Sequence, residues 1–140
     1  MICPVCKIDA LIVEYKNIEL DTCPKCQGVW FDSGELELLL EAAGLGESEK
    51  YLGDIAVAPD VTTSEKKRRC PVCRRKMKKH YIDKESKIMV DVCTGGHGIW
   101  FDGNEVTQLI KTLSAKASEK SAAQDVLGFI GEMFKYKSQE

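Results

Sequence analysis

The sequence has no long hydrophobic run, few aromatic residues and only two histidines among its 140 residues. No apolar stretch approaches the 18 or so residues that a membrane-spanning helix needs. Met1 and Ile2 lead straight into a cysteine pair, without the pattern of a signal peptide. We therefore expect a cytoplasmic protein in a reducing compartment, in which cysteines are available to bind metal.

The sequence also lacks an arrangement of nucleophile and base that would indicate catalysis. His80 has no evident catalytic partner, and we expect it to lie on the surface as neither base nor metal ligand. We therefore expect that the protein is not an enzyme. A less favoured alternative is a thiol-redox or zinc-responsive protein, which would require a C-x2-C pair to be released from metal.

Cysteine is the residue that the chain has in excess. All seven cysteines lie in closely spaced pairs or, for Cys93, four residues before His97. An odd number leaves one cysteine over in a disulfide framework, whereas two C-x2-C pairs about 15–20 residues apart are typical of zinc sites. We predict two Zn²⁺ ions per chain, each with four ligands: Cys3, Cys6, Cys23 and Cys26 in the first site, and Cys70, Cys73, Cys93 and His97 in the second.

The chain is one small unit made twice. The segment from Cys23 to Glu35 returns as Cys93 to Glu105, with a glycine, a Trp-Phe-Asp run and a glutamate at matching places. We call each short segment that carries two ligands a zinc turn. Each unit is too small for a large core, so metal has to supply much of its stability. We expect Cys26→Ser to unfold the first unit and to leave the second largely intact.

Local patterns predict the elements of each unit. Alternating residues predict strands at 10–15 and 18–22, joined by Lys16-Asn17, and at 77–83 and 87–92. An apolar face made of Leu36, Leu39, Leu40 and Ala43 predicts a helix that Gly44 ends. Its counterpart has Val106, Leu109, Ile110 and Leu113 and extends to about residue 123. Asp32 and Glu35, like Asp102 and Glu105, are placed to form capping boxes.

These elements predict a small, metal-stabilised α+β fold. It consists of two tandem zinc ribbons, each a β-hairpin between two zinc turns followed by an α-helix, and a C-terminal amphipathic helix. We expect the first ribbon at 1–45, a linker with a basic end at 46–69, the second ribbon with its long helix at 70–120, and the C-terminal helix at 121–140. The sequence does not specify how the ribbons are oriented.

The repeated Trp-Phe pairs and glycines have structural explanations. We expect Trp30, Phe31, Trp100 and Phe101 to cover the metal sites and receive the helices; exposed rings that stack on a base or a partner are the alternative. Gly28 and Gly98 are expected to provide a positive φ beside the metal.

Charge is unevenly distributed along the chain. Residues 1–60 carry 4 basic and 12 acidic side chains, whereas residues 61–100 carry 11 basic and 4 acidic ones. The basic residues predict a surface for nucleic acid, another anion or an acidic protein partner, with pairing to the acidic first half as the alternative. They are Lys66, Lys67, Arg68, Arg69, Arg74, Arg75, Lys76, Lys78 and Lys79.

The C-terminal tail has apolar residues at helical spacing: Val126, Leu127, Ile130, Met133 and Phe134. Three interpretations are open. The helix packs back on the ribbons, it binds a partner or a second copy of the chain, or it lies on a membrane surface.

The pattern C-P-x-C, a hairpin, and C-P-x-C-x-G-x-W-hydrophobic-D-x-x-E resembles the transcription-factor-IIB-type zinc ribbons of bacteria and archaea. The first copy matches throughout, whereas the second has Cys93-x3-His97 in place of its last C-P-x-C. The resemblance implies a role in transcription. We expect a regulatory or adaptor module that binds nucleic acid or the transcription machinery. The alternative is a protein–protein scaffold that uses the acidic first ribbon and the C-terminal helix.

Overall fold

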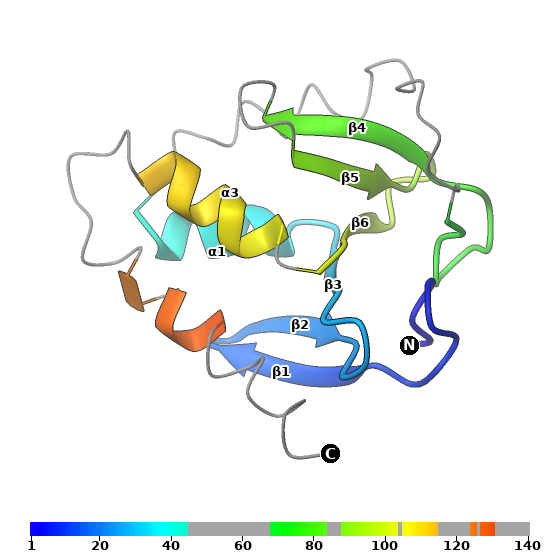
Figure 1. Ribbon diagram of the computed structural model, residues 1–140, viewed down its shortest axis with the longest axis horizontal. Helices are drawn as coiled ribbons and strands as arrows, with labels where there is room; N and C mark the ends of the chain where they lie inside the picture. The colour runs from blue at the N-terminus through cyan, green and yellow to red at the C-terminus, as the bar shows by residue number, and fades with distance from the viewer. Residues whose placement is uncertain (45–67, 84–87, 104, 115–123, 126, 131–140) are drawn as a thin grey trace.

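The computed structural model describes residues 1–44, 68–83, 88–103, 105–114, 124–125 and 127–130. The chain has a small α+β fold in which the described strands form one six-stranded sheet of order β1-β2-β3-β6-β5-β4 (Figure 1). Within the described residues, each ribbon contributes three strands and one helix. The strands are β1 (Leu11–Tyr15), β2 (Ile18–Thr22), β3 (Val29–Asp32), β4 (Lys78–Asp83), β5 (Ile88–Val92) and β6 (Gly98–Phe101), and the helices are α1 (Glu35–Ala42) and α3 (Glu105–Ser114).

Both predicted hairpins are confirmed. β1 and β2 pair antiparallel, and Lys16 and Asn17 between them both have positive φ, at 48° and 68°. This is the backbone of a two-residue hairpin turn whose twist matches that of the strands. β4 and β5 pair in the same way, and the turn that joins them lies outside the described residues.

The two ribbons are joined through their third strands. β3 pairs antiparallel with β6, and Trp30 lies opposite Trp100 in the register. The sheet order is therefore the same in each half when read from the centre outward, which gives the molecule an approximate two-fold arrangement. Figure 1 shows the first ribbon (blue) and the second (green) on opposite sides of this central pair.

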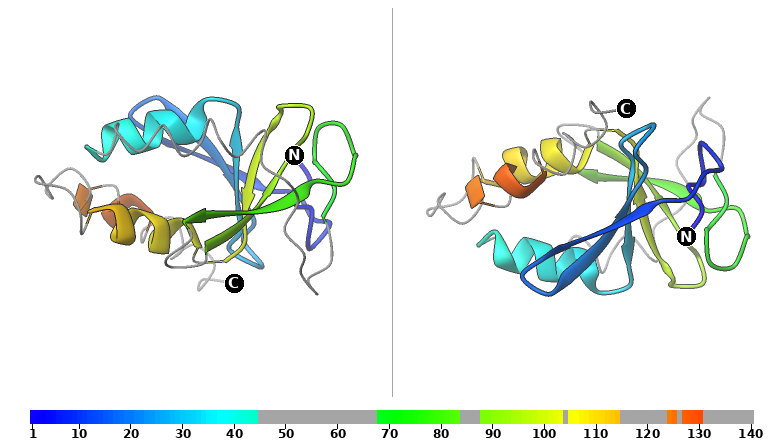
Figure 2. Two further views of the ribbon diagram at one scale, coloured as in Figure 1. Left: turned by 90° about the horizontal axis from the view of Figure 1, so that it is seen from above. Right: turned by 90° about the horizontal axis from the view of Figure 1, so that it is seen from below.

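The helices bury the apolar faces that their spacing predicts. Leu36, Leu39, Leu40 and Ala43 of the first ribbon, and Val106, Leu109 and Ile110 of the second, are all buried in one core. The side chain of Leu113 and the predicted extension of α3 lie outside the described residues. The rings of Phe31 and Phe101 meet edge to face at 5.4 Å across the centre of this core. Figure 2 shows both helices at one end of the strands and the zinc turns at the other.

The predicted capping box is wrong for α1. The helix is preceded by Gly34 at φ 90°, and no side chain caps its free amides. The Asp32 carboxylate instead accepts a 2.9 Å hydrogen bond from the indole nitrogen of Trp30. Asp102 accepts the same bond from Trp100 at 2.8 Å. The repeated aspartate therefore orients the tryptophan two residues before it, because alternate residues of a strand share a face.

The described part of the tail packs on the first ribbon. Residues 127–130 are helical, Ile130 is 1% exposed within the core, and the Phe129 ring lies 4.8 Å from the Tyr15 ring. These contacts fit the interpretation in which the tail packs back on the ribbons. Val126, Met133 and Phe134 lie outside the described residues, as does most of the linker, so the domain boundaries stay predictions.

Among the residues that the structure describes, no helix is long and apolar enough to cross a membrane.

Candidate metal centres

The zinc turns share one local backbone. In each C-x2-C turn that starts at Cys3, Cys23 or Cys70, the amide four residues after the first cysteine donates to that cysteine's carbonyl at 2.9–3.0 Å. The donor residues Lys7, Gln27 and Arg74 all have positive φ, between 63° and 67°. This turn also directs backbone amides at sulfur, such as Cys6 N to Cys3 Sγ at 3.2 Å and Val72 N to Cys70 Sγ at 3.3 Å. N–H groups directed at sulfur stabilise a thiolate, which is the form that binds metal.

The first site brings together the four cysteines that the sequence predicts. The sulfur atoms of Cys3, Cys6, Cys23 and Cys26 lie within 4.8 Å of one another. Cys3 Sγ and Cys26 Sγ, from different zinc turns, are 3.7 Å apart. The edge of a zinc–thiolate tetrahedron with 2.3 Å bonds is about 3.8 Å, so this set of donors fits a zinc ion.

The second site forms despite its different spacing. Cys70, Cys73, Cys93 and His97 also place their ligand atoms within 4.8 Å of one another. Cys73 Sγ lies 3.6 Å from Cys93 Sγ, and His97 Nδ1 lies 3.3 Å from Cys93 Sγ. The one extra residue between the ligands is accommodated at Gly96, whose φ is 80° and whose amide donates to the Cys93 carbonyl at 3.1 Å. The two clusters are therefore compatible with two zinc ions.

Each cluster contains one thiol with a lowered pKa. When no metal is bound, the hydrogen bond with Cys26 lowers the pKa of Cys3 to about 5, and this contact together with burial raises that of Cys26. In the second cluster the backbone N–H of Arg75 lowers the pKa of Cys73 to about 7, while burial raises that of Cys70 to about 11. Because zinc binds the thiolate, zinc affinity at both sites should fall as the pH is lowered.

The Trp-Phe pairs divide between the two ends of the molecule. Trp30 and Trp100 pack with metal-site cysteines, whereas Phe31 and Phe101 pack with the helices. All four are at most 1% exposed. The structural interpretation of these pairs is confirmed, and none of the four rings is available to stack on a base.

The prediction of a positive φ at Gly28 is wrong, because the Gly28 backbone does not have that conformation. The physical reason for glycine is close approach. A β-carbon on Gly28 would overlap the Trp100 ring, and one on Gly98 would lie 2.6 Å from the Trp30 ring and overlap the Phe31 carbonyl. The tryptophan of each ribbon thus packs against the glycine of the other ribbon, where a side chain would not fit.

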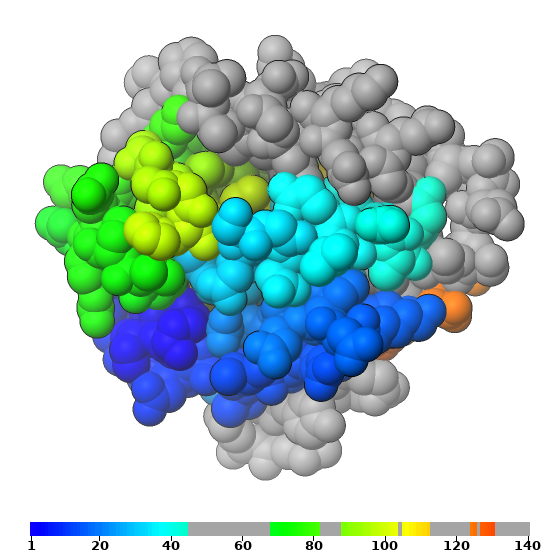
Figure 3. Space-filling view, turned by 180° about the vertical axis from the view of Figure 1, so that it is seen from behind, coloured from blue at the N-terminus to red at the C-terminus, as the bar shows by residue number. Residues whose placement is uncertain are grey.

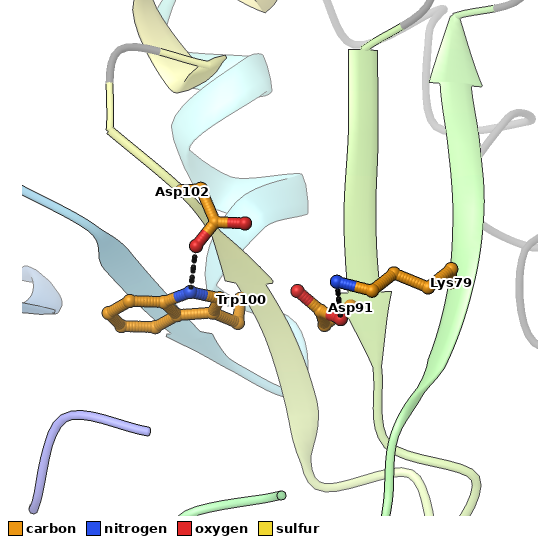
Figure 4. A network of polar contacts seen from close by, with 4 residues as sticks. All are labelled: Lys79, Asp91, Trp100 and Asp102. Carbon is orange, nitrogen blue, oxygen red and sulfur yellow. Dashed lines mark hydrogen bonds and ion pairs between the residues drawn. The ribbon is translucent and has the colours of Figure 1, made fainter. Parts of the chain in front are cut away.

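The basic residues of the second ribbon do not all lie on its surface. Arg69, Arg74, Arg75 and Lys76 are exposed around the third zinc turn, and Arg68 and Lys78 are half-buried. Lys79 is 1% exposed and pairs with the buried Asp91 at 2.8 Å, across from β4 to β5 (Figure 4). It therefore lies outside any exposed basic surface. Lys66 and Lys67 lie outside the described residues.

Burial raises the pKa of Asp91 to about 6, although Lys79 opposes the shift. The equivalent carboxylate in the first ribbon is Asp21, which lies opposite Ile12 in place of a lysine. His80, on β4, is half-buried and lies outside both metal clusters.

The fold and the two sets of donors define a tandem zinc-ribbon protein. A family model described as transcription factor zinc-finger, of the TFIIB zinc-ribbon type, matches residues 2–42 and again residues 69–112. The two matches together cover more than half of the chain, which therefore belongs to this family, with two copies in tandem. No curated protein and no solved structure matched the chain.

Sequence reasoning missed the central pairing of β3 with β6. It also missed the buried Lys79–Asp91 ion pair and three exposed apolar residues on and beside β1, which are Ile8, Leu11 and Ile12. By the matching register, these three stand where the second ribbon has Arg75, Lys78 and Lys79. Aligning the two hairpins residue by residue would have shown this exchange of apolar for basic side chains.

Proposed function

We propose that the protein is a non-catalytic zinc-binding module that acts as a regulatory or adaptor protein. Its second ribbon binds nucleic acid, or an acidic surface of the transcription machinery, through the exposed cations of the third zinc turn. The observation that carries this proposal is the cluster Arg69, Arg74, Arg75 and Lys76, all exposed on one turn and its flanks. Membership of the family supports the connection with transcription.

The charge of this turn exceeds what the metal site requires. Seven of the twelve residues from Arg68 to Lys79 are basic and none is acidic. Zinc with three thiolates and one histidine has a net charge of −1, which one or two cations would balance. Figure 3 shows the green segment that carries this turn at one corner of the molecule, next to the first ribbon. Such a concentrated positive surface attracts phosphates or carboxylates.

Two further features support a binding role over catalysis. Each cluster offers four protein donors, whereas a catalytic zinc site keeps one coordination position for water or substrate. We therefore propose that each site holds one structural zinc ion. Because both tryptophans are buried, we propose that binding depends on ionic contacts to phosphate, with no base stacking on these rings.

The test is binding to a short double-stranded DNA, and separately to an RNA of equal length, over a range of salt concentrations. Removing three cations with Arg74→Gln, Arg75→Gln and Lys76→Gln should weaken binding. If all three contact phosphate, the slope of log K against log salt for the duplex should fall in magnitude by about 2.7.

A matched control removes the same charge elsewhere. Lys7→Gln, Lys16→Gln and Lys25→Gln change three exposed lysines of the first ribbon and should leave binding near wild type. Equal losses in the two triple variants would overturn the assignment of the surface, because they would show only an effect of net charge. Absence of salt-dependent binding to either nucleic acid would leave an acidic protein as the partner.

The alternative function, a protein–protein scaffold, is favoured by a different observation. β1 is an edge strand of the sheet, and Ile12, Leu11 and Ile8 on and beside it are 67%, 45% and 37% exposed. An exposed apolar edge can accept a further strand. Ile12→Lys should abolish a partner contact made through this edge, whereas truncation before residue 121 should remove one made through the tail.

A further inference from the structure

The first zinc site is supported by a residue of the second ribbon. The Gly28 carbonyl accepts hydrogen bonds from Cys23 N at 3.0 Å and from Thr22 Oγ1 at 3.1 Å, so this glycine closes the turn that carries Cys23 and Cys26. Trp100, at the other side of the central strand pair, covers the Gly28 backbone so closely that a β-carbon has no space. The indole of Trp100 from the second ribbon therefore packs against the backbone that closes the first metal site.

The second zinc site is supported by the first ribbon in return. The Gly98 carbonyl accepts the amide of Cys93 at 3.1 Å, and the Trp30 ring covers Gly98. The Ser33 amide also donates to the carbonyl of His97 at 3.0 Å. A ligand residue of the second site is thus directly bonded to the first ribbon.

The two sites share one buried cluster. It contains cysteines of both sites and both indoles: Cys3, Cys23, Trp30, Cys70, Met77, Cys93 and Trp100. Asp32 and Asp102 fix the two indoles through their nitrogen atoms. Each indole is therefore held at its nitrogen by its own ribbon and at its ring by the zinc turn of the other ribbon.

We infer that the two zinc sites are energetically coupled, so that metal in either site strengthens binding in the other. Trp100 is a positioning residue for the first site and Trp30 for the second. Metal binding orders a zinc turn, and the ordered turn is the surface on which the opposite indole packs. This inference rests on the two zinc sites proposed above but is independent of nucleic-acid binding. It replaces the expectation of two independently folding ribbons.

The first test is a Co²⁺ titration of the metal-free protein, because the absorption of a four-cysteine site differs from that of a three-cysteine, one-histidine site. His97→Ala disables the second site and should weaken binding at the first by about tenfold or more. Cys26→Ser disables the first site and should weaken the second by the same factor, because coupling between two binding sites is reciprocal. Complete loss of binding at the intact site is the strong form of the same result.

The second test asks whether the indoles carry the coupling. In Trp100→Leu, disabling the second site with His97→Ala should weaken binding at the first site by a smaller factor than it does in the wild type, because only the contacts of Trp30 and Ser33 remain between the ribbons. Leu39→Ala is the matched control, since it weakens the helix core without touching the cluster around the metals. Leu39→Ala should lower the stability of the protein. It should leave unchanged the factor by which disabling one metal site weakens binding at the other.

Three results would overturn the inference. The first is an intact site that keeps its wild-type affinity when the other is disabled. The second is Trp100→Leu with undiminished coupling. The third is Leu39→Ala abolishing the coupling as fully as Trp100→Leu, which would show general destabilisation. The inference also requires that the wild type binds two zinc ions per chain, which elemental analysis measures. A value below two would contradict the proposed pair of zinc sites itself, whereas the three results above would contradict only their coupling.

Discussion

The indole of Trp100 in the second ribbon lies against the backbone of Gly28 in the first, where a β-carbon would overlap its ring. Trp30 and Gly98 form the reciprocal contact. The G-x-W pattern that the two copies share is therefore half of a contact whose other half lies in the opposite copy. A single copy of the unit would leave its tryptophan uncovered.

Gly28→Ala is expected to destabilise the protein by about 1–3 kcal/mol or more, because the added methyl group must displace the Trp100 ring in a close-packed cluster. Chemical denaturation of the zinc-loaded protein measures the change. Gly128→Ala is the control, since among the described residues nothing beyond its own helix and chain neighbours lies within 4 Å of a β-carbon built there. A Gly28→Ala protein as stable as the control variant would show that the indole has another place to go.

Asp32→Ala is expected to release the indole N–H of Trp30 and to cost about 1 kcal/mol, because Asp32 accepts its hydrogen bond at 2.9 Å. The indole N–H resonance of Trp30 in a proton NMR spectrum should shift strongly. The Trp100 resonance serves as the internal control, since its own acceptor Asp102 is unchanged. Loss of α1 helicity with an unmoved indole signal would instead support a capping role for Asp32.

The sequence was sufficient to predict the hairpins, the buried faces of the helices and the two clusters of side chains that could hold metal. Each of these depends on local spacing: alternation in β1 and β2, three- and four-residue periodicity around Leu36 and Leu40, and C-x2-C pairs. The family resemblance was confirmed over both copies. Even the Cys93-x3-His97 variant formed the predicted cluster, because Gly96 at φ 80° accommodates the longer turn.

The relation between the two ribbons could not be predicted in the same way. β3 and β6 have four residues each, and they pair across about seventy residues of chain. A repeat shows that two units are alike and carries no information on whether they pair. Asp32 was interpreted as a helix cap for the same reason. The sequence shows that Asp32 lies just before a helix. It does not show that the Trp30 indole, on the same face of the strand, donates a hydrogen bond to the Asp32 carboxylate.

Asp91→Ala is expected to cost about 3–5 kcal/mol, because it removes the carboxylate that contacts the buried Lys79 ammonium at 2.8 Å. The double variant Lys79→Met, Asp91→Leu should recover most of this loss, since apolar residues of similar size avoid burying either charge. Chemical denaturation of the zinc-loaded single and double variants provides the double-mutant cycle. A double variant no more stable than Asp91→Ala would indicate that the pair holds β4 and β5 in place by more than its charges.

Asp91 should make the folded protein less stable as the pH rises, which is the opposite of the effect of a carboxylate whose pKa is lowered on folding. Burial raises the pKa of this carboxyl from its ordinary value of 3.8 to about 6 in the folded protein. The folded state therefore binds more protons between these values, and the stabilising contribution of Asp91 is present below about pH 4 and lost as the pH rises through 6. NMR titration of the carboxyl carbon should give a midpoint near 6. Lys79→Met should raise it, because the lysine lowers the pKa of Asp91.

A midpoint at or below 3.8 would contradict the raised pKa of Asp91. It would mean that Lys79 lowers this pKa by more than burial raises it. Comparison with Asp91→Asn at saturating zinc isolates the contribution of this one group from the protonation of metal ligands. The stability difference between wild type and this variant should change mainly between pH 4 and 6.

Removal of zinc by a chelator is expected to unfold both ribbons together. Structural zinc binding contributes on the order of 10–16 kcal/mol in zinc-finger peptides, which is comparable to the usual net stability of about 5–15 kcal/mol for a whole domain. Trp30 and Trp100 are both 0% exposed, so their fluorescence should shift to longer wavelength as the metal leaves and return when zinc is added back. In the wild type, the indole N–H resonances of Trp30 and Trp100 report on the two ribbons separately. In a coupled molecule the two resonances should leave their folded positions over the same range of chelator, whereas well-separated midpoints would mean that each ribbon holds its metal and its fold alone.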